Sequence, residues 1–417
     1  MLTYREALQQ VLDAAVVLPA RRVTLDQALG LVVAEHVVAA DPVPPFTNSG
    51  MDGFAVRAAD VAQAREHAPV CLRVLEDVPA GRVAACEVTQ GTALRIMTGA
   101  PLPGGADAVV PVEDTAAAGH PSREGSWVGV EVRKPVPRGA NIRLAGEDIP
   151  AGARVVESGA LLRPAEIGVL AEVGCAVVQV IPRPRVAVIT TGDELVDASE
   201  RPGPGRIRDA NAPALCAQAT AFGAVPVRFS RVPDRREDMT RVLSTATAAA
   251  DVVVTTGGIS MGERDCVKDA LEELGAERVF WRVAQKPAGP LGFWRLGGKP
   301  VFGVPGNPVA AMIVMEEYVR PMLRRMMGLS LLFRPERHGA LASEWARRQS
   351  DRRLHFLRVF VREENGELRA RLSGPQGSGI LSSMARSNAL ALIPGDATAV
   401  ASGGRVLLHL TDEPEDH

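Results

Sequence analysis

The chain has 417 residues, of which 46% are hydrophobic and 23% charged, and its net charge is −2. This length predicts several domains, and this balance is typical of a globular rather than a disordered protein. The near-zero charge excludes a global field that attracts nucleic acid or acidic lipid, and 4% aromatic residues are too few for a base-stacking surface. We therefore expect no nucleic-acid or membrane partner, and any anion site has to be local.

The N-terminus has no basic segment followed by an apolar stretch, so a secretory signal is not expected. No apolar run is long enough to cross a bilayer. The five cysteines are scattered and odd in number, which argues against a disulfide framework and against zinc-ligand spacing. These features predict a cytoplasmic protein.

In chain order, the first expected element is a helix over residues 4–16 with Thr3 as its N-cap. A second helix is expected after Thr24, because Thr24 and Gln27 have the spacing of a capping box. The proline-rich run at 41–45 then interrupts regular structure, since neither a helix nor a central strand can cross it.

Short β-prone pieces between Gly and Pro turns fill residues 41–142 and predict a small β domain. Pro164 then opens a helix that Gly174 ends. We expect this helix to pack back on the N-terminal helices, which gives a discontinuous domain of residues 1–40 and 143–180.

A different pattern occupies residues 181–328. Wholly apolar strands alternate with helices, the strands at 186–189, 252–254 and 301–304 and the helices at 212–222, 261–274 and from 309. Asn211 is the expected N-cap of the first of these helices. The alternation predicts a doubly wound α/β domain whose parallel sheet is covered on both faces.

Residues 329–417 turn to β structure. The apolar run from 354 to 361 reads as a strand, Asn365-Gly366 is a strong hairpin signal, and 406–410 forms the last strand. This pattern predicts a C-terminal β-barrel or sandwich.

Ligands of open parallel sheets bind beyond the carboxyl ends of the strands, and three unusual turns lie there. Asp193 and Glu194 follow the first strand; they suit a hard cation such as Mg²⁺, or they simply cap the next element. Gly257 and Gly258 follow the next strand, where a helix N-terminus can bind an anion and Asp265 would lie near the ligand.

Ser260 and Glu263 in that second turn fit a capping box, so a structural role is expected for them first. The third turn, residues 304–308, contains Pro305 and Asn307 and is either a frame for a ligand or a rigid connector. Together the three turns predict a crevice for a nucleotide phosphate and a metal ion. The chain contains neither a dinucleotide-binding fingerprint nor a P-loop.

Basic side chains are needed to bind phosphate or another oxyanion. Arg282 and Lys286 follow a probable strand, and Arg358 lies in the C-terminal strand run. A solvated or salt-bridged surface cation is the usual alternative for each. The run Gly377-Ser378-Gly379 can form an anion-binding nest or a flexible loop.

Several motifs in a fixed order resemble the molybdopterin molybdenumtransferases, the family of bacterial MoeA and the gephyrin E domain. They are Pro-Pro-Phe-Thr-Asn-Ser-Gly-Met-Asp-Gly-Phe-Ala at 44–55, Ile-Met-Thr-Gly-Ala at 96–100, Gly-Glu-Asp-Ile at 146–149, Thr-Thr-Gly-Asp-Glu-Leu at 190–195, residues 207–211, Gly-Gly-Ile-Ser-Met-Gly at 257–262, Pro-Gly-Asn-Pro at 305–308, and Gly-Ser-Gly at 377–379.

The resemblance implies four domains, an elongated homodimer and a cleft built between subunits. It implies an enzyme that inserts molybdate into adenylylated molybdopterin and releases AMP in the presence of Mg²⁺. Molybdopterin adenylyltransferase and the apoproteins of molybdoenzymes would be its partners.

The resemblance also implies roles for individual residues. The positions it makes catalytic are Asp52, Asp148, Glu194, Asp234, Asp265 and Lys286, with Asp193, Glu194 and Asp265 at the metal. Those it places at the substrate and its nucleotide are Phe54, Thr98, Gly257, Gly258, Ser260, Met261, Pro305 and Asn307. Those it links to molybdate or another anion are Arg282, Arg358 and Ser378.

Three positions depart from the family pattern. A second lysine of the family's Lys-Pro-Gly-Lys-Pro segment is missing at Gly289, an upstream lysine is Arg282, and Arg208 stands where a tyrosine is usual. Arginine keeps the charge of lysine but is not interchangeable with it. Two alternatives stay open: an enzyme that adenylylates molybdopterin, and a non-enzymatic scaffold with the same fold.

Overall fold

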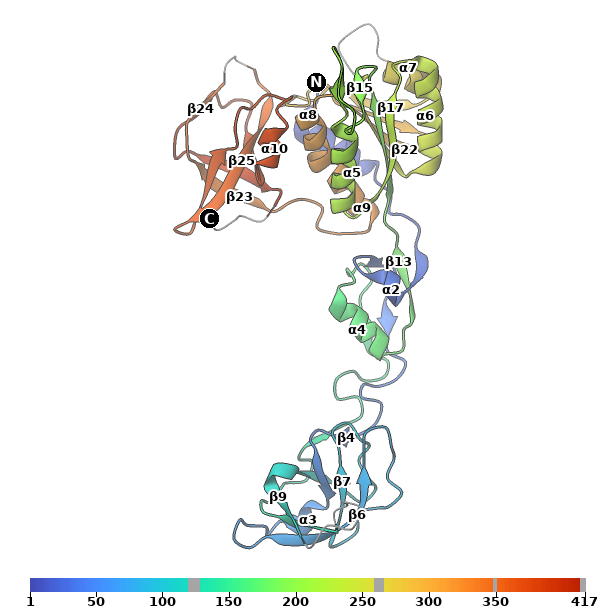
Figure 1. The fold of residues 1–417 in the computed structure, drawn as a ribbon, viewed down its shortest axis with the longest axis vertical. Coiled ribbons are helices and arrows are strands. Elements are labelled where there is room, and N and C mark those ends of the chain that lie inside the picture. Colours follow the sequence, from blue (N-terminus) through green and yellow to red (C-terminus); the bar gives the residue numbers. More distant parts are fainter. Residues whose placement is uncertain (119–127, 259–265, 348–350, 413–417) are drawn as a thin grey trace.

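The computed structural model describes residues 1–118, 128–258, 266–347 and 351–412. The molecule is elongated: a small β unit forms one end, a slender middle unit follows, and an α/β unit lies beside a β-barrel at the other end (Figure 1). No helix among these residues is long and apolar enough to cross a membrane.

The α/β unit is built on a six-stranded sheet in the order β17-β14-β18-β22-β21-β19. Alternate residues of its strands enter two cores: Val186 and Val188 pack on one face, Ala187 and Ile189 on the other. These strands are β14 (Arg185–Thr191), β17 (Val225–Val232), β18 (Val252–Thr256), β19 (Glu277–Trp281), β21 (Gly292–Leu296) and β22 (Lys299–Val304). Both faces are covered, as the doubly wound pattern predicts.

The three strands expected from the sequence pair in parallel as predicted, but the sheet has an antiparallel edge. β14, β17, β18 and β22 pair in parallel, but β21 pairs antiparallel with both β22 and β19. The cause is the two-residue turn Gly297-Gly298, whose positive φ angles of 57° and 79° close a tight hairpin, and a hairpin can only join antiparallel strands.

Helices cover the two faces in separate groups. One face carries α6 (Arg236–Ala249) and α7 (Cys266–Glu273). The other carries α5 (Asn211–Ala221), α8 (Pro308–Val314), the π-helical turn η2 (Met315–Val319) and α9 (Arg320–Met326). The first helix, α1 (Tyr4–Asp13), packs in this second core through Ala7, Leu8, Val11 and Leu12.

The middle unit has a three-stranded sheet and two helices with a core of its own. It contains α2 (Leu25–Ala28), α4 (Pro164–Glu172), β1 (Arg21–Thr24), β2 (Val32–Val33), β3 (Val37–Val38), β12 (Arg154–Val156) and β13 (Val177–Ile181). The helix α4 contacts α2. The expectation that it packs on both N-terminal helices is therefore right for α2 and wrong for α1, because amphipathic spacing alone does not show which core a helix joins.

The predicted N-cap at Thr3 and the predicted capping box at Thr24 and Gln27 have different outcomes. Thr3 caps α1 and exchanges hydrogen bonds with Glu6. Thr24 makes no side-chain cap bond, and α2 is only four residues long.

The small β unit is a six-stranded sheet in the order β8-β5-β7-β6-β10-β9, which confirms its predicted β character. Its main elements are β5 (Gly53–Val56), α3 (Ala58–Val61), β6 (Val70–Val78), β7 (Thr92–Ile96), β8 (Ala108–Pro111), β9 (Thr115–Ala117) and β10 (Gly129–Val132). Next to it, β4 (Asn48–Ser49) pairs with β11 (Ile142–Arg143).

The C-terminal unit is a closed barrel, because β25 pairs with both β26 and β27. Its strands are β23 (Glu336–Leu341), β25 (Leu354–Glu364), β26 (Glu367–Leu372), β27 (Ala389–Ile393) and β29 (Arg405–Leu410). The predicted hairpin at Asn365-Gly366 is confirmed, with φ angles of 53° and 79° that match a type I′ turn.

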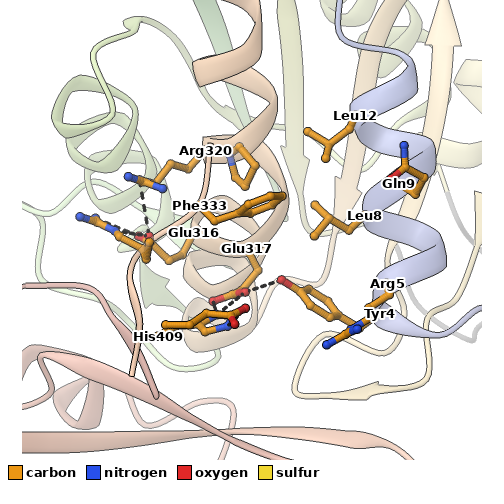
Figure 2. Close-up of a pocket in the computed structure, with 13 residues that line it drawn as sticks. Tyr4, Arg5, Leu8, Gln9, Leu12, Glu316, Glu317, Arg320, Phe333 and His409 are labelled. Atoms are coloured by element: carbon orange, nitrogen blue, oxygen red, sulfur yellow. Dashed lines mark hydrogen bonds and ion pairs between the residues drawn. The ribbon is translucent and has the colours of Figure 1, made fainter. Parts of the chain in front are cut away.

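Buried polar contacts join the barrel to the α/β unit (Figure 2). Glu317, on η2, accepts a hydrogen bond from Tyr4 Oη at 2.7 Å. Its carboxylate also lies 3.0 Å from His409 Nδ1, on barrel strand β29. Burial lowers the pKa of His409, but the hydrogen bond and charge of Glu317, with Glu336 beyond it, outweigh burial and raise it.

Candidate functional site

A cavity of about 330 Å³ opens at the carboxyl ends of β14, β18 and β22. It is lined by residues of all three strand-end turns, including Glu194, Gly257 and Asn307, and by Gly379 from the barrel unit. The predicted convergence of the three turns in one crevice is therefore confirmed.

Close backbone contact between the turns explains the glycine at position 257. Gly257 has φ +92°, and a Cβ there would lie 2.4 Å from the carbonyl oxygen of Thr191. Gly306 of the third turn lies beside it, since its own Cβ would be 3.6 Å from Gly257 Cα. The N–H of Gly257 donates to Val304 O at 3.2 Å, so this donor is engaged within the protein.

Asn211 links two of the turns. Its Nδ2 donates to Thr256 Oγ1 and to Gly306 O, both at 2.8 Å. Asn211 is thus not the N-cap that the sequence predicts. The side chain of Asp209 caps the start of α5 instead, because its Oδ1 accepts a hydrogen bond from the N–H of Ala212.

Asp209 is a residue that sequence reasoning missed. Its side chain is buried, and its Oδ2 accepts a 2.7 Å hydrogen bond from Thr190 Oγ1 at the end of β14. The sequence pointed to Asp209 only through its place in the 207–211 segment. The start of the helix pattern at residue 212 favoured Asn211 as the N-cap instead. Asp209 therefore fixes the start of α5 to the end of β14.

Three carboxylates lie at the end of β14. Glu194 lines the cavity, and its carboxylate folds over Gly192, where a Cβ would lie 2.6 Å from it. Asp234 accepts a hydrogen bond from Thr191 Oγ1. Asp193 accepts one from the backbone N–H of Asp234 at 3.4 Å; this contact joins the turn after β14 to the segment before α6 and is not a cap of the next element.

Of the predicted anion-binding residues, Arg282, Lys286 and Ser378 lie near the contact of the barrel with the α/β unit, whereas Arg358 is buried. Lys286 is exposed on β20 (Gln285–Lys286), which pairs with barrel strand β25, and Arg282 precedes it with φ +72°. The main chain of Ser378 contacts the start of α8, because its carbonyl accepts from Val309 N.

Arg358 does not face the cavity as an anion-binding residue would. Only 1% of it is exposed, and its guanidinium donates to the carbonyl oxygens of Pro375, Gln376 and Gly377 and to Ser383 Oγ. Burial lowers its pKa to about 10. The expectation of direct anion contact is corrected to support of the loop that precedes Ser378.

Asp52 and Thr98 belong to the small β unit, which Figure 1 shows at the opposite end of the molecule from the α/β unit. Asp148 lies between β11 and β12, and its backbone N–H donates to Val43 O at 3.1 Å. Asp52 Oδ1 accepts 2.7 Å hydrogen bonds from both Oγ1 and the N–H of Thr98. These bonds lower the pKa of Asp52. Phe54 is fully buried in the core of this unit, so the expectation that its ring contacts a nucleotide is corrected to a packing role.

Ser260, Met261, Glu263 and Asp265 lie outside the described residues, and so does the first part of the helix predicted from 261. Pro305 is described and buried; its carbonyl accepts a hydrogen bond from Thr256 Oγ1 at 3.2 Å.

Models of three protein regions match the chain. The MoeA N-terminal region (domains I and II) matches residues 2–174, a probable molybdopterin-binding domain matches 187–325, and the MoeA C-terminal region (domain IV) matches 342–410. A molybdopterin molybdenumtransferase 2 of Mycobacterium tuberculosis is 38% identical over 386 residues, which cover 91% of this chain and 92% of that protein. The chain belongs to the MoeA family.

Other MoeA relatives agree over nearly the full length. A molybdopterin molybdenumtransferase of Staphylococcus epidermidis is 32% identical and aligns with 99% of this chain and 96% of its own. A crystal structure of a MoeA protein from Pyrococcus horikoshii superimposes with a TM-score of 0.82 at 30% identity, covering 99% of this chain and all of that one. The MoeA fold thus extends over the whole chain.

Proposed function

We propose that the chain is a transferase of molybdenum cofactor biosynthesis that inserts molybdate into adenylylated molybdopterin and releases AMP. The observation that carries the proposal is the cavity at the ends of β14, β18 and β22, where Glu194 faces a space framed by three rigid turns. A nucleotide-linked phosphoanhydride suits such a crevice, because open α/β sheets bind phosphates at the carboxyl ends of their strands.

The carboxylates near the cavity fit Mg²⁺. No group of three or more His, Cys, Asp or Glu side chains that could hold a metal occurs within the described ranges. Mg²⁺ does not need one, since it is usually held by one or two carboxylates together with substrate phosphates and water. Glu194 would hold the ion, with Asp193 and Asp234 as nearby carboxylates; Asp265, which lies outside the described residues, stays a proposed ligand on the family resemblance. When bound, Mg²⁺ neutralises charge on the phosphoanhydride oxygens.

The chain's own residues position the substrate. The contacts of Asn211 and Asp209 hold the three turns in place before any ligand arrives, so little reorganisation accompanies the reaction. Lys286, Arg282 and the Ser378 loop lie where the barrel meets the α/β unit and would attract molybdate.

Asp52, Thr98 and Asp148 belong to the proposed site only if a second copy brings its small β unit to the cavity. We therefore propose a homodimer in which each site combines the α/β unit of one copy with the small β unit of the other. The enzyme would work in the cytoplasm, accept its substrate from a molybdopterin adenylyltransferase and pass the product to molybdoenzyme apoproteins.

The test is an assay of AMP release from adenylylated molybdopterin. We expect release that requires both molybdate and Mg²⁺ and that accompanies formation of molybdenum cofactor. Consumption of ATP without molybdenum insertion would identify an adenylyltransferase instead. Absence of any release with both ligands present would reject the proposal.

A further inference from the structure

The wall of the cavity carries one cationic side chain among its described residues, that of Arg208. An anionic ligand in this cavity also meets the carboxylate of Glu194, which repels it. A positive side chain on the wall favours binding of an anion whether or not Glu194 holds a cation, and among the described residues of the wall Arg208 is that side chain.

The contacts of Arg208 leave its outer nitrogens available. Arg208 lies on β16 (Ile207–Arg208), which pairs with β15 (Leu195–Val196), and it is exposed. Its Nε donates to the carbonyl oxygen of Glu200 at 2.9 Å. No carboxylate within the described residues forms an ion pair with it, so Nη1 and Nη2 can donate to a ligand.

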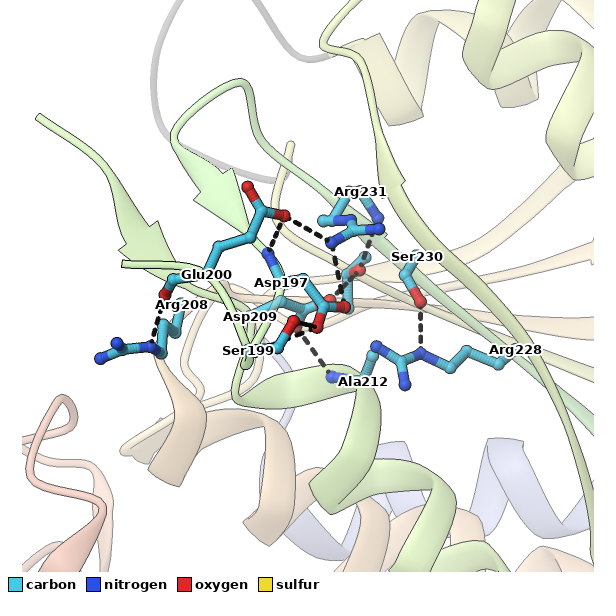
Figure 3. A network of polar contacts seen from close by, with 10 residues as sticks. Asp197, Ser199, Glu200, Arg208, Asp209, Ala212, Arg228, Ser230 and Arg231 are labelled. Carbon is cyan, nitrogen blue, oxygen red and sulfur yellow. Dashed lines mark hydrogen bonds and ion pairs between the residues drawn. The ribbon is translucent and has the colours of Figure 1, made fainter. Parts of the chain in front are cut away.

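The turn of residues 197–200, whose Glu200 carbonyl accepts the hydrogen bond from Arg208 Nε, is itself fixed (Figure 3). Arg231 Nη1 lies 3.0 Å from Asp197 Oδ2 and 3.5 Å from Glu200 Oε1, at the two ends of the turn. The backbone N–H of Arg231 donates to Thr190 Oγ1 at 3.0 Å. Glu200 O, which accepts from Arg208, is thus tied to the end of β14. A guanidinium anchored in this way loses less conformational entropy when it binds a ligand.

Other polar groups of the wall are already engaged within the protein. Thr190 donates to Asp209, and Thr256 to Pro305 O. Asn211 Nδ2 donates to both Thr256 Oγ1 and Gly306 O. Arg208 therefore stands out as a charged donor that still has capacity for a ligand.

We propose that Arg208 binds the nucleotide phosphate of the substrate through Nη1 and Nη2 and makes the cavity selective for the phosphorylated ligand. A planar guanidinium matches the geometry of two phosphate oxygens, which an ammonium or an amide does not. This assignment rests on the proposed function, because it takes the ligand of the cavity to be a nucleotide.

The experiment measures dissociation constants of AMP and of adenosine for the full-length protein and three variants. Arg208→Gln removes the charge, and Arg208→Lys keeps the charge without the paired donors. Arg206→Gln is the matched control, because it removes an equal charge from an exposed residue two positions away that does not line the cavity.

We expect Arg208→Gln to weaken AMP binding about tenfold at low salt, Arg208→Lys to weaken it less, and Arg206→Gln to leave it within about twofold. Adenosine should bind all four proteins alike. Unchanged AMP affinity in Arg208→Gln, or equal losses for AMP and adenosine, would overturn the phosphate contact and leave the proposed function standing. A wild-type protein that binds neither compound would reject the nucleotide site and this assignment with it.

Discussion

The cavity of the α/β unit and the Asp52 region of the small β unit differ in how their polar groups are fixed. At the cavity, the turns touch each other through backbone, and buried Asp209 and half-buried Asn211 fix their spacing. At the other end of the molecule, Asp52 and Thr98 are exposed and hold each other by two short hydrogen bonds. The cavity is therefore preformed within one chain, whereas the proposed site needs a second copy to bring the Asp52 region to it.

The largest expected effect concerns the cavity carboxylate. Glu194→Gln keeps the size of the side chain and removes the charge, so we expect AMP release to fall by about 100-fold or more. Glu237→Gln, at an exposed carboxylate on α6 of the same unit, is the control and should retain nearly full activity. Activity of Glu194→Gln within about threefold of wild type would remove Glu194 from the reaction.

The next effect tests how tightly the cavity is packed. Gly257→Ala places a Cβ against Thr191 O at positive φ and should cost about 3 kcal/mol of the free energy of unfolding. Gly99→Ala, beside Thr98 in the small β unit, also has positive φ but meets no atom within 4 Å, so it should cost about 1 kcal/mol. Thermal unfolding followed by circular dichroism measures both. Equal losses would contradict the contrast between the two regions.

A third region, the junction of barrel and α/β unit, combines burial with charge. The folded protein raises the pKa of His409, so the stabilisation by its contact with Glu317 is complete below the unfolded pKa near 6.5 and is lost as pH rises through the folded value. We expect the melting temperature of wild type to fall about 2–4 °C more than that of His409→Gln between about pH 6 and pH 9. Parallel pH profiles of the two proteins would contradict this role.

The smallest effect belongs to the exposed region. Thr98→Val removes the Oγ1 hydrogen bond that lowers the pKa of Asp52 but leaves the backbone bond. The pKa of Asp52 should rise toward 3.8, so Asp52 loses its charge at a higher pH as the solution is acidified. The acid limb of the pH–rate profile should move upward by a fraction of a pH unit. A limb that does not move would show that Asp52 does not act as a carboxylate in the reaction.

Local sequence patterns predicted the regular elements and the place of the cavity. Apolar strands followed by Gly-containing turns placed Glu194, Gly257 and Asn307 at one sheet edge, because strand ends of a parallel sheet meet there. The hairpin at Asn365 was equally local, since its turn type needs only positive φ at two adjacent residues.

What the sequence did not predict depends on contacts between distant segments. The same strand pattern that predicts β5 does not show that Phe54 faces the core rather than a ligand. Arg358 reads as a surface cation until the 375–377 carbonyls are seen around it. Asn211 and Asp209 both suit an N-cap, and only the neighbouring strands decide which of them caps the helix.

The most direct test of the split site mixes two inactive variants. Asp52→Asn and Glu194→Gln are co-refolded or co-expressed with different tags, and AMP release is measured on the mixture and on each variant alone. If each site combines Glu194 of one copy with Asp52 of the other, a mixed dimer contains one intact site, and a random mixture should recover about one quarter of wild-type activity. A mixture no more active than its separate components would contradict a site assembled from two copies.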